Sequence, residues 1–335
     1  MQISVVIPTC NRKARLLSLV QNLQHSFYPI EEVVIVDSGE DMLSETDFSG
    51  IKGFKINYIR TEKSVCIQRN EGVKNANSSW ILLCDDDVEL PNDYLQKLVA
   101  HIETRPATGA VSGRWLQREK NEWKATYPES SAIGLFWKFI FQLGIWGEIS
   151  CNPSNIVMKK IKEYYHHKGN HLSKAGWPVI TDFSGENFTT PVYSLGSCLV
   201  KKEWLLNSPF DEVLDRHGIG ENYGVIMGFP DASIHVSNET HVYHHQEPIN
   251  RLQKPLQYYR RALALHYFIK TKSRLKNIKT RWLLWSLTGN LIRFMFSENS
   301  TMIRAAFKCI WIILTGRNPY YKAAKNGRKI AEPRL

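Results

Sequence analysis

The chain has 335 residues, 43% of them hydrophobic, which is enough for one large α/β core and a smaller appendage. The net charge of +11 is uneven, because residues 251–335 contain 19 lysines and arginines but only two acidic residues, so residues 1–250 are net negative. The six cysteines form no CxxC pair, which argues against a zinc finger and favours a reducing compartment. No recognised nucleic-acid-binding module is visible, so we expect no nucleic-acid partner.

The first 80 residues alternate short apolar runs with amphipathic segments. Strands are predicted at residues 3–7, 31–37 and 54–59. A helix is predicted after the first strand, where the apolar positions of residues 16–23 fit helical spacing and Thr9 and Asn11 can cap the first turn. A second helix is expected at about 67–75. This alternation implies a parallel sheet with right-handed crossovers.

Three consecutive aspartates follow a fourth apolar run, at residues 80–84, which reads as a buried strand. Asp85, Asp86 and Asp87 would lie at the carboxyl end of that strand, and Asp37 ends the second strand in the same way. Open α/β sheets bind ligands at this edge. Adjacent carboxylates repel one another unless they share a cation, and oxygen ligands suit Mg²⁺ or Mn²⁺ completed by substrate phosphates. The alternative is a solvated acidic turn before a helix.

The segment after the first strand contains neither GxGxxG nor GxxxxGK[ST], the two glycine-rich motifs that cradle phosphates. A metal would therefore have to carry the phosphate charge. This combination points away from dehydrogenases and P-loop NTPases.

Several blocks of the sequence resemble, in order, the family 2 glycosyltransferases with the GT-A fold. They are VVIPTCNR, VDSGE, QRNEGVKNANSSWILLCDDDVELP, LGSCLVKKEWL, PFDEVLDRHGIGENYG and HVYHHQEP. The resemblance implies a Rossmann-like, mostly parallel sheet flanked by helices over residues 1–250. Its nucleotide-sugar half would span residues 1–115 and its acceptor half residues 116–250, followed by a basic amphipathic helical region at 251–335.

The resemblance also implies where the nucleotide would bind. Pro8, Thr9 and Arg12 would lie beside it, and Asp37 would hydrogen-bond the base. The family often has a second aspartate at the position of Ser38. The sequence therefore leaves open which nucleobase the donor carries.

The diphosphate and the metal would involve a second group of residues. Arg69 would face the base or the diphosphate, where its guanidinium matches phosphate oxygens, unless it is a surface arginine. By the same resemblance, Asp85 or Asp86 would contact the ribose, and Asp87 would bind Mn²⁺ or Mg²⁺. Such an ion stabilises the charge on the leaving nucleotide.

The position of the catalytic base departs from the family pattern, because the family usually carries Glu-Asp where this chain has Glu221 and Asn222. Asparagine cannot accept the proton of an acceptor hydroxyl. Either Glu221 serves as the base, or Asp215 or another carboxylate does, or the enzyme is impaired. Glu221 can also be read as an acid that favours the N-terminus of a helix.

His241, His244 and His245 lie in IHVSNETHVYHHQEP, which is typical of a strand followed by a loop. By resemblance, a late histidine completes the metal shell, and His244 is the first candidate and His241 the second. Strand alternation places His241 and Tyr243 on one face and His244 on the other. Neutral imidazole suits Mn²⁺ better than Mg²⁺. The alternative is ordinary histidines at a strand end.

Two regions of the sequence are candidates for contact with a membrane surface. Residues 132–146, AIGLFWKFIFQLGIW, are too short to span a bilayer and predict a buried helix or an interfacial segment. In residues 251–335, aromatic residues and Lys or Arg mix in RWLLWSLTGNLIRFMF and MIRAAFKCIWIILTG, which suits helices on an anionic membrane surface. The alternative is that these helices pack on the catalytic domain. The N-terminus shows no signal-peptide pattern, so the cytoplasmic face of the plasma membrane is the predicted location.

These features predict an inverting, metal-dependent glycosyltransferase. It would move a hexosyl or deoxyhexosyl group from a nucleoside-diphosphate sugar to a lipid-linked or growing glycan acceptor, in a bacterial surface-polysaccharide pathway. Two alternatives stay open. A non-catalytic, membrane-associated adaptor is suggested by Asn222, and a sugar nucleotidyltransferase would need a glycine-rich basic loop where this chain has residues 8–10.

Overall fold

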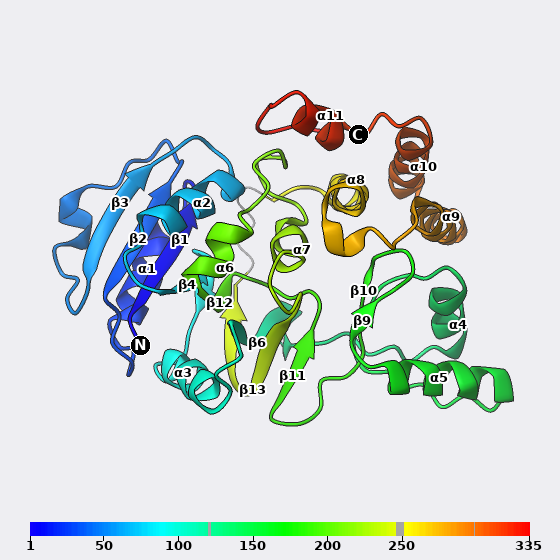
Figure 1. The fold of residues 1–335 in the computed structure, drawn as a ribbon, viewed down its shortest axis with the longest axis horizontal. Helices are drawn as coiled ribbons and strands as arrows, with labels where there is room; N and C mark the ends of the chain where they lie inside the picture. The colour runs from blue at the N-terminus through cyan, green and yellow to red at the C-terminus, as the bar shows by residue number, and fades with distance from the viewer. Residues whose placement is uncertain (120–121, 246–250, 298) are drawn as a thin grey trace.

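The computed structural model describes residues 1–119, 122–245, 251–297 and 299–335. Within these residues, a ten-stranded sheet forms the body, and its main path runs β11-β13-β6-β12-β4-β1-β2-β3. Figure 1 places β1–β3 at one end, a smaller sheet with α4 and α5 at the other, and α8–α11 along one side. The fold is the mixed α/β architecture that the sequence predicts.

The N-terminal half of the sheet is parallel. Its strands are β1 (Ile3–Thr9), β2 (Glu32–Asp37), β3 (Lys55–Arg60) and β4 (Trp80–Cys84). The helices that connect or follow them are α1 (Lys13–Leu23), α2 (Val65–Asn75) and α3 (Tyr94–Thr104), with the short η1 (Glu45–Phe48) after β2. β1 continues through Pro8, which pairs with Val36 on β2, while the pairing of β1 with β4 stops at Val6. A proline is therefore tolerated, because no β4 residue pairs with it on the other side.

The second half of the sheet adds strands from distant parts of the chain. They are β5 (Val88–Glu89), β6 (Ala110–Glu119), β7 (Glu122–Lys124), β11 (Asn187–Thr190), β12 (Ser197–Lys201) and β13 (Ile234–His244). β12 runs antiparallel to both β4 and β6, and β13 runs parallel to β6. β13 also pairs with β5, which sets His244 opposite Val88. This pairing brings a histidine from the second half beside the triple aspartate.

A smaller subassembly follows β7. It contains α4 (Ala132–Ile140), α5 (Ile156–Lys168) and a three-stranded sheet of β8 (Ile145–Trp146), β9 (His171–Leu172) and β10 (Pro178–Ile180). Residues 132–146, predicted as one helix or interfacial segment, divide into a helix that ends at Ile140 and a strand at 145–146. On α4 only Leu135 is buried, while Ile133, Phe136 and Ile140 are exposed.

The C-terminal region is helical, as predicted, and packs on the body. Short elements α6 (Lys202–Asn207) and α7 (Glu221–Ile226) precede it, and it comprises α8 (Lys254–Thr271), η2 (Ser273–Leu275), α9 (Thr280–Phe296), α10 (Ser300–Leu314) and α11 (Pro319–Lys325). Buried residues of α8, such as Leu263 and Phe268, belong to the same apolar core as the main sheet. The predicted boundary at residue 250 lies outside the described residues.

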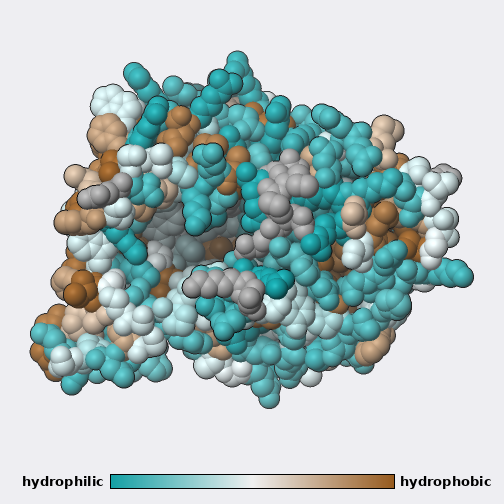
Figure 2. All heavy atoms as spheres, turned by 180° about the vertical axis from the view of Figure 1, so that it is seen from behind, coloured by the Kyte–Doolittle hydropathy of each residue, from teal (hydrophilic) through white to brown (hydrophobic). Residues whose placement is uncertain are grey.

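Apolar side chains are also exposed on this side of the molecule. In Figure 2 they gather along the left edge, where the reversed view places α4, α5, α9 and α10. None of the helices in the described ranges combines the length and the apolar character needed to cross a membrane.

Candidate functional site

A cavity of about 360 Å³ opens at the carboxyl edge of β1 and β4, and we call it the aspartate cavity. Nine of the ten predicted site residues line it: Pro8, Thr9, Arg12, Arg69, Asp85, Asp86, Asp87, Glu221 and His244. They come from five separate parts of the chain, and the sheet topology brings them together.

Asp86 is held from the first strand. Its carboxylate accepts hydrogen bonds from the Thr9 hydroxyl at 2.8 Å and from Arg12 Nη1 at 2.8 Å, and the same nitrogen lies 3.3 Å from Asp87. Arg12 directly precedes α1, so this helix begins with its guanidinium fixed over two carboxylates. The predicted caps Thr9 and Asn11 are wrong. Thr9 bonds Asp86, and the Asn11 side chain accepts from the backbone of Glu40.

Asp87 and His244 face each other at the metal position that the sequence predicts. His244 Nε2 lies 3.3 Å from Asp87 Oδ1, and Arg251 lies 3.7 Å from Asp87 Oδ2. Burial raises the pKa of Asp87, but the bond with His244 and the charges of Arg12 and Arg251 outweigh it and lower the pKa to about 2. Asp87 is therefore an anion at neutral pH. His241 instead lies 2.8 Å from the Tyr243 hydroxyl, on the other face.

These residues supply some of the ligands of a divalent cation but not a complete set. An oxygen and a nitrogen 3.3 Å apart can both ligate one ion, and the buried His244 Nδ1 has no hydrogen-bond partner. No group of three or more His, Cys, Asp or Glu side chains in the described residues is close enough to hold an ion. Mg²⁺ sites of this kind use one or two protein ligands and complete their shell with substrate phosphates and water. The donor set fits an ion that arrives with a phosphate-bearing ligand.

Arg69 joins the aspartates to the second half of the chain. Its Nη2 lies 2.5 Å from Asp85 and its Nη1 lies 2.9 Å from Glu221. The side chain is only 4% exposed and packs over the ring of Phe210, so the alternative of a surface arginine is wrong. Gly196, on the loop before β12, faces Asp85, and a Cβ there would clash with that carboxylate.

Glu221 is the first residue of α7, after Gly220 in a left-handed conformation. Burial and the charge of Asp85 raise its pKa, which Arg69 opposes. A raised pKa is typical of carboxylates that exchange protons near neutral pH. Asn222 lies 3.5 Å from Arg69 through its amide oxygen. Asp215, the other candidate base, has a side chain with no exposed surface, paired with Arg260 at 2.9 Å, so it has no access to a ligand.

Asp37 is the one predicted site residue that does not line the cavity. Its carboxylate accepts hydrogen bonds from Gly39 N at 2.7 Å, the Tyr58 hydroxyl at 2.8 Å and Arg60 at 2.7 Å. It does lie at the same sheet edge, since it pairs with Thr9.

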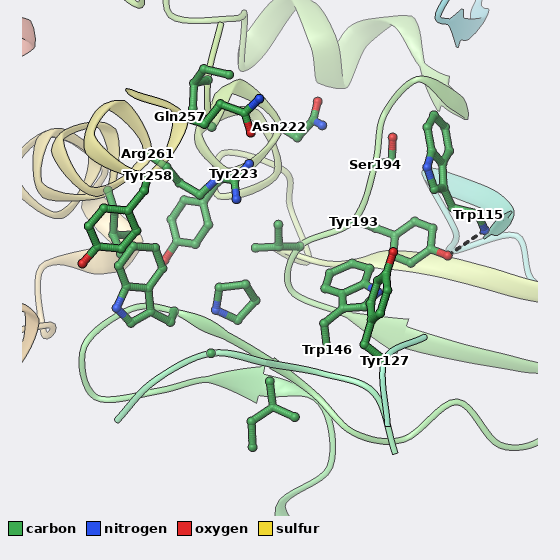
Figure 3. Close-up of a pocket in the computed structure, with 18 of the residues that line it drawn as sticks. Trp115, Tyr127, Trp146, Tyr193, Ser194, Asn222, Tyr223, Gln257, Tyr258 and Arg261 are labelled. Atoms are coloured by element: carbon green, nitrogen blue, oxygen red, sulfur yellow. Dashed lines mark hydrogen bonds between the residues drawn. The ribbon is translucent and has the colours of Figure 1, made fainter. Parts of the chain in front are cut away.

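A second and larger cavity, of about 1050 Å³, meets the aspartate cavity at Asp85, Glu221 and His244. Eight Phe, Trp and Tyr side chains contribute to its walls, so we call it the aromatic cavity. Figure 3 shows Tyr127, Trp146 and Tyr193 gathered on one side and Tyr223, Tyr258 and Arg261 on the other. The predicted site did not include these residues. The only sequence signal was the abundance of aromatic residues in the second half, which did not show which of them converge.

Comparison with known proteins agrees with the fold. A family model described as "Glycosyl transferase family 2" matches residues 4–167. An uncharacterized glycosyltransferase of Bacillus subtilis, YwdF, is 30% identical over 105 residues, which cover 31% of this chain and 39% of that protein. An uncharacterized glycosyltransferase of Haemophilus influenzae is 31% identical over 108 residues, covering 31% of this chain and 35% of that protein. The matches thus span well under half of each relative.

Solved structures extend the likeness of fold over nearly the whole chain. S. aureus TarS 1-349 in complex with UDP-GlcNAc aligns with a TM-score of 0.50 at 12% identity, covering 98% of this chain and 93% of that one. GalNAc-T7 with UDP, GalNAc and Mn²⁺ aligns with a TM-score of 0.53 at 13% identity, covering 96% and 58%. At such low identity the likeness shows the fold, which is of the GT-A type. Residues 4–167 thus match the model of glycosyl transferase family 2, and the fold of the chain is that of GT-A glycosyltransferases.

Proposed function

We propose that this protein is an inverting, metal-dependent glycosyltransferase that uses a nucleoside-diphosphate sugar. The observation that carries the proposal is the junction of two cavities at Glu221 and Asp85. The aspartate cavity offers cationic and carboxylate groups for a diphosphate and its counterion. The aromatic cavity offers space for an acceptor, and a carboxylate stands where the two meet.

In this proposal Glu221 is the general base. It takes the proton of an acceptor hydroxyl in the aromatic cavity while that oxygen attacks the anomeric carbon of the sugar. The bond from the anomeric carbon to the phosphate oxygen breaks, and the nucleoside diphosphate leaves on the opposite face, which inverts the configuration. Arg69 holds Glu221 in place through its 2.9 Å contact, and Arg12 fixes the neighbouring aspartates.

Asp87 and His244 would hold the divalent ion. Bound there, Mn²⁺ or Mg²⁺ would supply Lewis-acid stabilisation of the negative charge on the departing diphosphate. GalNAc-T7, solved with UDP and Mn²⁺, supports the choice of such an ion, and TarS, solved with UDP-GlcNAc, makes a UDP-sugar the first donor to test.

The test is donor hydrolysis and transfer with UDP-, GDP- and dTDP-sugars in the presence of Mn²⁺, Mg²⁺ or EDTA. We expect metal-dependent turnover of one donor, and we expect Asp87→Asn to abolish it. The matched control is Asp93→Asn, which changes a partly exposed carboxylate that pairs with Lys97 and lies six residues from Asp87 in the sequence. Comparing Mn²⁺ affinity of His244→Ala and His241→Ala distinguishes the two candidate ligands. Turnover that persists in EDTA, or the absence of any bound donor, would contradict the proposal.

We further propose that the acceptor is a lipid-linked or growing glycan, and that the protein docks on the cytoplasmic face of an anionic membrane. Phe307, Trp311 and Leu314 are 56–65% exposed and recur at intervals of four and three residues, so they share one face of α10. Ile133, Phe136 and Ile140 form a similar exposed face on α4.

The aromatic cavity reaches the same end of the molecule. α4 packs on α9 through Phe141, which stacks on Trp285, and through the Trp285 indole, which donates to the carbonyl of Ile140. Lys138 of α4 and Arg293 of α9 both line the cavity. An acceptor anchored in a membrane could therefore present its head group to the cavity beside the apolar helices. A surface-polysaccharide pathway is the setting this arrangement favours.

A further inference from the structure

The aromatic cavity contains more positive charge than the protein itself compensates. Lys254 and Arg261 of α8 and Arg293 of α9 line it. In the described part of the chain, none of these three side chains forms an ion pair or a side-chain hydrogen bond. Two further cavity lysines differ in this respect, because Lys124 pairs with Glu119 and Lys138 with Glu129.

The acidic groups of the cavity are already engaged. Its only lining carboxylates among the described residues are Asp85 and Glu221, and both bind Arg69. All three cations are exposed, and a cleft lined by one sign of charge concentrates ligands of the opposite sign. Three such cations facing one cavity therefore indicate an anionic ligand.

Arg261 is the best placed of the three for a ligand near the reacting group. Figure 3 shows it extending from α8 alongside Tyr223, toward the interior of the cavity. Arg261 and Glu221 both line this cavity. Between these two described residues there is nevertheless no ion pair, which leaves the fork of the guanidinium available for an oxyanion.

We propose that the aromatic cavity takes an acceptor that carries an oxyanion, either a phosphate or a carboxylate, and that Arg261 binds this group with Lys254 and Arg293 around it. The apolar faces of the aromatic rings would pack against the sugar part of the same molecule. Naming the ligand an acceptor rests on the proposed function above. The binding of an anionic sugar in this cavity does not.

The test measures binding without turnover. Trp115, Trp146 and Trp177 line the aromatic cavity and do not line the aspartate cavity, so their fluorescence reports on the former. Glucose 1-phosphate, glucuronic acid and methyl glucoside are titrated in the presence of excess UDP, which occupies the donor site if the proposed function holds. We expect at least one charged sugar to bind more tightly than methyl glucoside, and the comparison of the two identifies phosphate or carboxylate as the preferred anion.

Arg261→Gln removes the charge and keeps much of the side-chain volume. We expect it to weaken binding of the charged sugar by about tenfold or more, since charge-assisted hydrogen bonds are the strong ones. Lys254→Gln, at an exposed position without a partner, gives a smaller loss with no risk to folding. Arg328→Gln is the matched control, because it removes one exposed arginine that does not line the cavity.

Equal binding of charged and neutral sugars, or equal binding by the wild type and Arg261→Gln, would overturn the inference. Full displacement of the charged sugar by UDP would also overturn it, because the anion would then occupy the donor site. These outcomes are separate from those of the donor assay. Metal-dependent turnover with no effect of Arg261→Gln on binding refutes only the anionic acceptor, and binding that depends on Arg261 without turnover refutes only the transferase.

Discussion

At the scale of single residues, the most informative contact is the one between Arg69 and Glu221. A buried guanidinium that bridges Asp85 and Glu221 fixes the carboxylate at the meeting point of the two cavities. It also opposes the desolvation that raises the pKa of Glu221. The contact with Arg69 thus favours the anionic form of a buried carboxylate, which is the form that a general base requires. Asn222 can contribute only hydrogen bonds there.

We predict that Glu221→Gln lowers kcat by about 10²–10⁴-fold, the usual contribution of a general base, with little change in donor affinity. The base acts when it is deprotonated, so kcat of the wild type should rise with pH through a pKa above the usual glutamate range, and Glu221→Gln should lack this rise. Steady-state kinetics across pH, with donor affinity measured separately, checks both effects. Glu239→Gln, which alters an exposed glutamate outside both cavities, is the control. Unchanged activity of Glu221→Gln would favour another base or the non-catalytic adaptor.

The sequence predicted much of the aspartate cavity and little of the aromatic one. Strand ends can be read from apolar runs, so the residues that follow them, such as Asp85–Asp87, can be assigned to one edge. The ion pair of Arg69 with Glu221 joins residues 152 positions apart, and no local pattern encodes it. The cluster of Tyr127, Trp146 and Tyr193 depends on how β8 and the loop before β12 fold back, which a single sequence does not show.

At the scale of elements, the C-terminal helices are tied to the body by a buried network around Asp215. Its carboxylate accepts hydrogen bonds from Arg260 of α8 at 2.9 Å, from the Tyr320 hydroxyl of α11 at 2.8 Å and from His217 N at 3.0 Å. Arg260 also bonds Glu332 at 2.6 Å. Asp215 is therefore a structural residue that joins the loop before α7 to two helices from the end of the chain.

We predict that Asp215→Asn destabilises the protein by about 3–5 kcal/mol, because it leaves Arg260 as a buried charge with a weakened partner. Burial raises the pKa of Asp215, but the bond with His217, the charge of Arg260 and the Tyr320 hydroxyl together lower it. A lowered folded-state pKa gives stability that is present above the unfolded value of about 4 and is lost as the pH falls through the folded value. The thermal unfolding midpoint should therefore decrease as the pH falls below about 4. The decrease should be smaller in Asp215→Asn, which lacks this ionisable group.

Thermal unfolding followed by circular dichroism from pH 7 down to pH 3 measures both the destabilisation by Asp215→Asn and the pH dependence of stability. Asp41→Asn, which changes an exposed aspartate, is the control and should leave the profile of the wild type unchanged. Parallel acid profiles for the wild type and Asp215→Asn would show that the network does not stabilise the fold through ionisation of this carboxylate.

Some helices and strands could be predicted from the sequence, whereas others depend on long-range pairing and could not. Strands β1 to β4 and helices α9 and α10 were expected, because long apolar or amphipathic runs dominate their sequences. The second half of residues 132–146 was misread, since aromatic residues occur in both helices and strands and the short β8 is formed only by pairing with β10. The antiparallel placement of β12 between β4 and β6 depends on pairing over more than 80 residues, beyond the reach of periodicity.

At the scale of the whole molecule, the sheet and the C-terminal helices form one apolar core. Residues of α8, α9, α10 and α11, including Leu263, Leu287, Cys309 and Tyr320, are buried with residues of β1 and β4. Removing residues 251–335 would expose this core and separate Asp215 from Arg260. A test of membrane docking by truncation would therefore confuse loss of binding with loss of folding, and surface substitutions are the appropriate test.

We predict that the protein binds vesicles containing anionic lipid and that Phe307→Ser/Trp311→Ser weakens this binding by at least tenfold. Burying two such aromatic side chains contributes about 3 kcal/mol or more, and Arg304 on the same helix adds attraction to anionic lipid. Both aromatic side chains are more than half exposed, so the double variant should fold normally. Phe27→Ser/Met42→Ser is the matched control, because Phe27 and Met42 are 68% and 64% exposed and lie in the segments before and after β2. Figure 1 places β2 at the opposite end of the molecule from α10. Cosedimentation with vesicles of neutral and anionic composition, at low and high salt, separates the two contributions. A protein docked on the membrane should keep its apolar contribution to binding at high salt and lose the contribution that depends on lipid charge. Equal binding by both double variants would instead show that α10 does not face the membrane.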